Sequence, residues 1–92
     1  MNKRIRKEIE YHLRLYKDLE PADPWKNVIE SVVTKYQDTE KGRLIDLRYF
    51  KGKTEVQICM ELFISKRLYY DWIRDILQDL ALMAAYEKLI KP

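Results

Sequence analysis

Cysteine and glycine are scarce in this chain of 92 residues, which contains one cysteine and two glycines. A single thiol, that of Cys59, cannot form a disulfide within the chain. The sequence also lacks a recognisable leader peptide and any apolar run long enough to cross a membrane. These absences predict a soluble, cytoplasmic protein that does not bind a membrane.

Patterns typical of catalysis are missing as well. The one histidine, His12, and the one cysteine are too few for a zinc site, and no glycine-rich phosphate loop or nucleophile elbow is present. The acidic pair Asp75 and Asp79 falls on one face of a predicted helix, where it suggests solubilising charge. We therefore expect no catalytic residue, no metal, no cofactor and no small-molecule substrate, and we do not expect an enzyme.

Basic residues are unevenly distributed, although the net charge is only +3 and the sequence pI is near 9.0. The cations from Lys3 to Lys7 fit solvated helix charges that pair with acids four residues further on. The segment from Arg43 to Arg74, in contrast, holds seven basic and four acidic residues. A basic surplus concentrated on one segment favours a polyanionic partner.

Apolar residues recur at helical spacing in about five stretches, and the few glycines and prolines fall at or near the ends of these stretches. The predicted fold is all-α, with one domain over residues 1–92. Residues 1–38 form an N-terminal helical pair in this prediction, and residues 39–92 form a second unit. The expected helices cover residues 3–19, 24–36, 39–50, 55–62 and 66–89.

Several helix ends have recognisable signatures. Asp23, which precedes a proline, is expected to cap the second helix. Thr54 and Gln57 fit a capping box, in which the side chain of each residue bonds the backbone N–H of the other. Gly52 is the expected left-handed stop of the third helix. Ser65 is the expected cap of the last helix.

The segment from Thr54 to Leu77 is the most informative part of the sequence, because it indicates a helix-turn-helix. A short helix ends at Leu62, a tight turn follows, and the next helix carries Lys66 and Arg67 on its exposed first turn. The N-terminal residues of a recognition helix must reach base edges in the major groove of DNA. The second unit is therefore predicted to be a helix-turn-helix with an extended final helix.

Two apolar features require packing partners. Val56 and Met60 lie four residues apart on a second face of the 55–62 helix, and we expect them to pack against an N-terminal helix. The final helix is longer than a recognition helix needs to be. Its extra length predicts packing either on the first two helices or on a second subunit, which would make a homodimer.

A longer pattern consists of Leu-Ile-Asp-Leu-Arg-Tyr-Phe (44–50), Gly52, Thr54, Gln57-Ile58-Cys59, Leu62 and Ile64-Ser65. This pattern resembles region four of bacterial sigma factors. More closely, it resembles the small phage late-gene transcriptional regulators of the RinA and ArpU type. Those regulators often carry paired tyrosines and a tryptophan, as in Tyr69-Tyr70-Asp71-Trp72 here, and the segment 9–16 resembles their N-terminal region.

Two residues depart from the family pattern. Cys59 replaces a small alanine, and Phe63 stands where a glycine often makes the turn. If Phe63 adopts a left-handed conformation, it costs on the order of 1 kcal/mol.

The resemblance implies which side chains face DNA. Tyr69 and Trp72 would brace the last helix from behind. The residues placed against bases are Lys66, Arg67, Leu68, Tyr70 and Asp71. The residues expected at phosphates are Arg43, Arg48, Lys51, Lys53, Thr54, Ser65 and Arg74.

Electrostatics favour the same site. Cations at the start of a helix oppose its dipole, by a few tenths of a kcal/mol up to about 1. A phosphate or the O6 and N7 atoms of guanine would turn this penalty into attraction for Lys66 and Arg67. Other roles also fit: Tyr70 as a residue at the edge of the core, Asp71 as an ion-pair partner of Arg67 or Arg74, and Arg74 as an ordinary surface residue.

The leading functional hypothesis is a sequence-specific regulator of transcription that binds double-stranded DNA and is encoded by a phage or prophage. An alternative is a phage DNA-packaging protein similar to a terminase small subunit, which also uses a helix-turn-helix. A third hypothesis is a module that binds host RNA polymerase without binding DNA by itself.

Overall fold

The computed structural model describes residues 1–90, which form five α-helices, two short helical segments of other types and no strand. The all-α prediction is confirmed. In chain order the elements are α1 (Lys3–Arg14), η1 (Tyr16–Asp18, a 3-10 turn), α2 (Pro24–Lys35), α3 (Glu40–Ile45), η2 (Asp46–Phe50, a π-helical segment), α4 (Glu55–Leu62) and α5 (Lys66–Tyr86).

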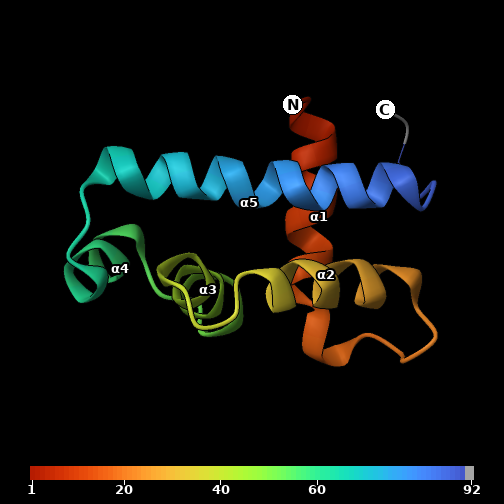
Figure 1. Cartoon of the computed structure of the whole chain (residues 1–92), viewed down its shortest axis with the longest axis horizontal. Coiled ribbons are helices and arrows are strands. Elements are labelled where there is room, and N and C mark those ends of the chain that lie inside the picture. The colour runs from red at the N-terminus through yellow and green to blue at the C-terminus, as the bar shows by residue number, and fades with distance from the viewer. Residues whose placement is uncertain (91–92) are drawn as a thin grey trace.

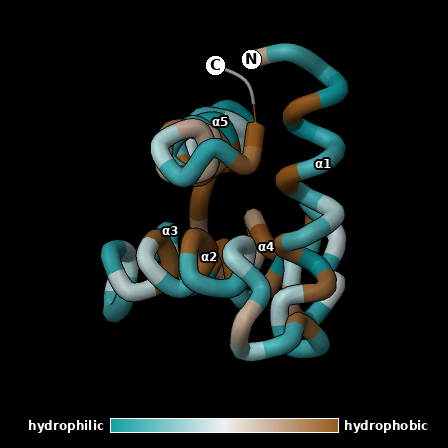
Figure 2. The backbone as a smooth tube through the Cα atoms, turned by 90° about the vertical axis from the view of Figure 1, so that its right-hand side faces the viewer, coloured by the Kyte–Doolittle hydropathy of each residue, from teal (hydrophilic) through white to brown (hydrophobic). Residues whose placement is uncertain are grey.

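The helices form two facing rows, as Figure 1 shows. The long helix α5 makes one row, while α4, α3 and α2 follow one another along the other row. Helix α1 crosses both rows at the side, and in the end-on view of Figure 2 its hydrophobic positions lie on the edge nearest α5. One continuous core joins all five α-helices and η2. Its largest fully buried side chains include Tyr69, Ile9, Leu13, Ile29, Leu44 and Ile58.

The predicted helix caps are confirmed. Asp23 Oδ1 accepts from the backbone N–H of Trp25 at 2.9 Å. The capping box is complete, because Thr54 N–H donates to the Gln57 side chain at 3.0 Å and Gln57 N–H donates to the Thr54 hydroxyl at 3.2 Å. Gly52 has the expected left-handed conformation, with φ of 67°.

Three helix boundaries differ from the prediction. Helix α1 ends at Arg14, and the chain continues as a 3-10 turn in which Tyr16 stacks on Phe50 with ring centroids 5.5 Å apart. The third helix changes from α to π geometry after Ile45. Helix α5 ends at Tyr86 rather than at residue 89, because Lys88 is left-handed and closes the helix with a pair of backbone hydrogen bonds.

The π segment changes which side chains are buried. Both Leu47 and Tyr49 are buried although they lie two residues apart, a spacing that would place them on different faces of an α-helix. Phe50, which follows Tyr49, is only partly buried. Sequence periodicity assumes 3.6 residues per turn and therefore did not predict the burial of Tyr49.

A close backbone approach explains Gly42, near the start of α3. A Cβ atom at this position would lie 2.3 Å from the carbonyl oxygen of Tyr36. Tyr36 is the C-cap of α2, so α2 and α3 meet too closely for any other residue. Gly42 is therefore a packing requirement and not only a weak point in the helix.

Ion pairs attach α5 to the other row. Lys35 Nζ lies 2.9 Å from Asp79 Oδ2, and Lys41 Nζ lies 3.1 Å from Asp75 Oδ2. The Tyr36 hydroxyl also donates to Asp79. The prediction that Asp75 and Asp79 serve only as solubilising charge is wrong, because both join α5 to residues between Lys35 and Lys41.

The expectation about the second apolar face of α4 is also wrong. Val56 and Met60 do not pack against an N-terminal helix, since they are 66% and 72% exposed. They point away from the core, on the side of α4 opposite the buried Ile58 and Leu62. Cys59, on the same helix, is half-buried.

Candidate nucleic-acid interface

A three-residue turn joins α4 to α5, and we call this unit (residues 55–74) the α4–α5 corner. Phe63 ends α4 in a left-handed conformation, with φ of 55° and ψ of 45°. The N–H of Ile64 then donates to the carbonyl of Cys59 at 3.1 Å, which closes the helix end. Ser65 is extended, and its hydroxyl accepts from the N–H of Leu68 at 3.1 Å. Each turn residue thus has a defined backbone role.

The first turn of α5 presents two cations to solvent. Lys66 and Arg67 are exposed, and neither forms an ion pair within residues 1–90. Tyr69, in the same turn, is 0% exposed, and Ile73 one turn later is also buried. The buried side chains fix the direction of the helix, so the two cations are held on its outer side. The structure thus places Tyr69 inward as expected.

The outer face of α5 continues with polar and apolar groups. Leu68 and Tyr70 are exposed. The Tyr70 hydroxyl donates to the carboxylate of Glu55 at the start of α4, and this hydrogen bond raises the pKa of Tyr70. Asp71 pairs with Arg74 through atoms 3.4 Å apart, and not with Arg67. Tyr70 and Asp71 therefore already have partners within the chain, and for Asp71 the pair with Arg74 is the alternative role expected from the sequence.

The N-terminus of α4 lies beside this face, because Glu55 reaches Tyr70 there. Lys53 precedes α4, is exposed, and has no ion pair within the described residues. Thr54 and Ser65 use their hydroxyl groups as helix caps. The structure thus brings the start of α4 and the start of α5 to one surface.

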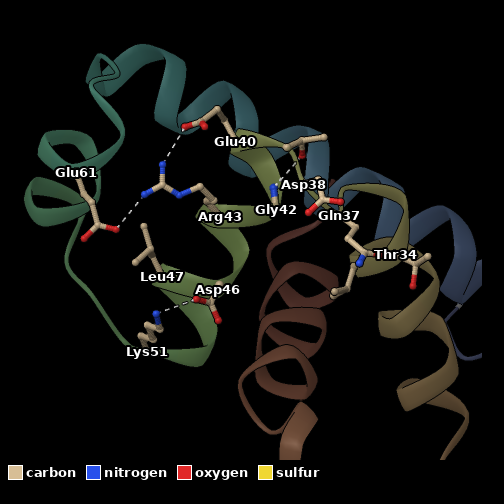
Figure 3. Close-up of a pocket in the computed structure, with 12 residues that line it drawn as sticks. Thr34, Gln37, Asp38, Glu40, Gly42, Arg43, Asp46, Leu47, Lys51 and Glu61 are labelled. Atoms are coloured by element: carbon tan, nitrogen blue, oxygen red, sulfur yellow. Dashed lines mark hydrogen bonds and ion pairs between the residues drawn. The ribbon is translucent and has the colours of Figure 1, made fainter.

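Arg43 and Lys51 line a separate, open cleft of about 720 Å³ between α2, α3, η2 and α4 (Figure 3). Arg43 lies between Glu40 and Glu61, with nitrogen–oxygen distances of 3.6 Å to each. Lys51 lies 3.2 Å from Asp46. Both cations are exposed, but each would have to exchange an acidic partner for a phosphate.

Arg48 is the expected phosphate contact that the structure places elsewhere. Its guanidinium donates to the buried hydroxyl of Tyr69 and lies 3.3 Å from Glu10 on α1. It also lies over the ring of Tyr49, at 5.2 Å from the centroid. Arg48 faces the interior because Glu10 and two tyrosines supply its partners there, so it is not part of the interface proposed below.

Glu10 is the centre of this network, and sequence reasoning missed its burial. Its carboxylate accepts from the Tyr49 hydroxyl at 2.7 Å and from Arg6 at 3.2 Å. Burial favours the neutral acid, but hydrogen bonds from Tyr49 and Arg6 and the charge of Arg48 outweigh burial and hold the pKa of Glu10 below its usual value. The only sequence signal was the spacing of Arg6 and Glu10, which predicted an ordinary surface pair.

Metal-ligand clusters and membrane-spanning helices were both sought within residues 1–90. No cluster of His, Cys, Asp and Glu side chains is placed to hold a metal ion there. None of the helices in this part of the chain is long and apolar enough to span a membrane.

Comparisons of the chain with protein-family models, with curated proteins and with solved structures found no match. The resemblance to sigma region four and to phage late-gene regulators therefore depends on the residues quoted for it. It remains a prediction.

Proposed function

We propose that this chain is a sequence-specific regulator of transcription that binds double-stranded DNA. In this proposal the α4–α5 corner is a helix-turn-helix and α5 is its recognition helix. The observation that carries the proposal is the pair of exposed cations, Lys66 and Arg67, at the start of a helix whose inner side is fixed by the buried Tyr69.

The charge arrangement supports an anionic ligand. The helix dipole places partial positive charge where Lys66 and Arg67 already stand, and the first turn of α5 contains no acid to offset it. A fold selected for stability alone would favour Asp or Glu in that turn. DNA supplies the missing negative charge through phosphates, and guanine offers two acceptors in the major groove.

The proposed contacts fall into two groups. Lys66 and Arg67 donate hydrogen bonds to base edges, and Leu68 contacts a thymine methyl group. Tyr70 and Asp71 contact bases after they release their partners within the chain. Phosphates are held by the residues around this surface, namely Lys53, Thr54 and Ser65. Arg74, Arg43 and Lys51 reach a phosphate only after exchanging their acidic partners within the chain.

The origin and assembly of the protein are separate parts of the proposal. A phage or prophage source follows from the resemblance alone. A homodimer would read two half-sites. The last two turns of α5 leave Leu82 and Tyr86 exposed for such a contact, although α1 and α2 cover the opposite side of that helix. Host RNA polymerase is a further candidate partner for a protein of this class.

The test is a selection of bound sequences from random DNA duplexes, followed by affinity measurements at two salt concentrations. We expect a preferred sequence and a steep loss of affinity as salt rises, because several phosphates are neutralised. Replacing Lys66 and Arg67 together with alanine should weaken binding by about tenfold or more, since each base contact is worth roughly 1–3 kcal/mol. The circular-dichroism signal should not change.

A matched control removes the same charge elsewhere. Lys3 and Lys7 are exposed on α1, and their double alanine variant should retain most of the affinity. Equal affinities of the two double variants would contradict the proposed site. A ring of many subunits in light scattering would instead favour the packaging hypothesis, and polymerase binding without duplex binding would favour the third hypothesis.

A further inference from the structure

Three highly exposed apolar side chains lie on α4 or directly after it, and we call them the α4 stripe: Val56, Met60 and Phe63. Val56 and Met60 are four residues apart and share one face of the helix, and Phe63 is the left-handed residue that ends it. Phe63 is 94% exposed, and none of the three contributes to the buried core. Large exposed apolar side chains that are gathered on one element are typical of interaction sites.

The backbone at Phe63 makes the stripe harder to explain by folding alone. Left-handed helix ends usually carry glycine or asparagine, because a side chain strains this conformation. Here a large aromatic residue occupies the left-handed position and still has almost no contact with the rest of the chain. Strain at a residue that contributes nothing to the core points to a role outside the fold.

Charges around the stripe indicate the kind of partner. Lys53 lies just before α4, and Lys66 and Arg67 lie just after the turn, so cations without ion pairs stand at both ends. Of the nearby acids, Glu61 is paired with Arg43, whereas Glu55 accepts from Tyr70 and keeps its charge beside Lys53. A complementary partner is therefore apolar in the middle and most acidic at the end that meets Lys66 and Arg67, with a weaker attraction to Lys53.

We propose that the α4 stripe is the docking surface for an acidic amphipathic helix of another protein. Apolar side chains of that helix, at spacings of three and four residues, would cover Val56, Met60 and Phe63. Its terminal acidic residues would pair with Lys53 at one end and with Lys66 and Arg67 at the other. This inference goes beyond DNA binding, because the stripe carries no charge of its own and no hydrogen-bonding group for a phosphate or a base edge.

The same charges disfavour a second copy of the chain. An antiparallel α4–α4 contact centred on Met60 would bring Lys53 of one copy towards Arg67 of the other. A parallel contact would bring each cation towards the same residue of the second copy. Both arrangements place like charges together. A lipid surface is also less suitable. Helices that lie in the bilayer interface present a long apolar face, whereas α4 has eight residues and contributes only Val56 and Met60 to the stripe, with Phe63 following it.

The test uses the full chain without DNA and a synthetic, fluorescently labelled peptide. The peptide is a helix of about 16 residues, with leucines at positions i, i+4 and i+7 and two glutamates at each end. Binding by fluorescence anisotropy is expected with a dissociation constant in the micromolar range, weakening as salt rises. Phe63→Gly and Met60→Gln should each weaken it by about tenfold or more. Phe63→Gly also suits the left-handed backbone, so this variant should fold at least as well as the parent.

Two controls distinguish binding at the α4 stripe from non-specific hydrophobic binding. Leu82→Gln removes another exposed apolar side chain, at the far end of α5, and should leave peptide affinity unchanged. A peptide with lysines in place of its glutamates should not bind. The inference is overturned if the acidic peptide does not bind the chain or if it binds the stripe variants as tightly as the parent. It is also overturned if Leu82→Gln lowers the peptide affinity as much as Phe63→Gly or Met60→Gln does.

Two other results would replace the proposed partner. Concentration-dependent doubling of mass that Phe63→Gly abolishes would assign the stripe to a second copy. Stripe-dependent binding to vesicles of phosphatidylserine and phosphatidylcholine, without binding to the peptide, would assign it to a lipid surface. None of these peptide, mass and vesicle measurements contains DNA. A negative result in them therefore does not test the DNA-binding proposal, and a lack of DNA binding does not test the docking proposal.

Discussion

Glu10 and Arg48 are 38 residues apart in the sequence, and their side chains meet at 3.3 Å. Arg48 in turn donates to Tyr69, the buried side chain directly behind Lys66 and Arg67. Helix α1 therefore supports the start of α5 through a polar network in the core. Although residues 1–38 carry none of the proposed DNA contacts, one of their carboxylates helps to position that surface.

Replacing Glu10 with glutamine should lower the free energy of unfolding by about 1–3 kcal/mol, because Arg48 loses its counter-ion in a half-buried place. Urea denaturation followed by circular dichroism measures the change. Glu8→Gln is the matched control, since Glu8 lies exposed on the same helix and should have an effect within about 0.5 kcal/mol. Equal effects of the two variants would contradict the role of the network.

Stability should fall in acid partly through Glu10. The pKa of this carboxyl is lower in the folded chain than its ordinary value of 4.5. Its contribution to stability is therefore fully present above 4.5 and disappears as the pH falls through the lower pKa of the folded state. Unfolding free energies measured from pH 7 to pH 3 should decline less steeply for Glu10→Gln than for the parent chain. Parallel curves would argue against this carboxylate as a contributor.

Gly42→Ala should destabilise the fold, by about 1–3 kcal/mol, because the new methyl group meets the Tyr36 carbonyl oxygen. The sign of this change in the free energy of unfolding is informative, because replacing a glycine inside a helix with alanine would otherwise add roughly 1 kcal/mol of stability. Thermal or urea denaturation measures it. Gly52→Ala tests a different cause: nothing lies within 4 Å of its added Cβ, but the left-handed φ of 67° should cost about 1 kcal/mol.

Phe63→Gly should leave the free energy of unfolding unchanged or raise it by up to about 1 kcal/mol. Glycine relieves the left-handed strain, while its extra freedom in the unfolded chain offsets part of the gain. Phe63→Ala removes the same ring but keeps a Cβ atom. It should therefore be less stable than the glycine variant by about 1 kcal/mol. Denaturation curves that show a higher free energy of unfolding for Phe63→Ala than for Phe63→Gly would contradict the proposed backbone strain.

The salt dependence of DNA binding should distinguish real phosphate contacts from buried cations. Lys53→Ala and Arg74→Ala should each reduce the slope of log K against log salt by about 1, the value for one lost phosphate contact. Arg48→Met should lower stability but leave the slope unchanged, because its guanidinium faces Glu10 and Tyr69. A smaller slope for Arg48→Met in a folded sample would restore Arg48 to the interface.

Local signals in the sequence predicted the helix ends well. Thr54, Ser65 and Gly52 act through the backbone within a few residues of themselves, so their roles can be deduced without knowing the fold. The outward position of Lys66 and the burial of Tyr69 followed from helical periodicity in the same way.

Long-range contacts were not predictable in the same way. Arg48 was assigned to a phosphate because nothing in its neighbourhood shows that Glu10 lies opposite it. The π geometry after Ile45 buries Tyr49, and no sequence pattern marks that change. Val56 and Met60 were expected to be covered by an N-terminal helix, but α1 and α2 pack beside the later part of α5 instead. Each error concerns which distant segment is the neighbour.

Lys53, Lys66 and Arg67 belong to both proposed surfaces, because a duplex and an acidic helix would each use these cations. The two partners would therefore compete for the chain. A protein carrying such a helix could release the bound duplex simply by occupying these side chains, and no rearrangement of the helices would be required.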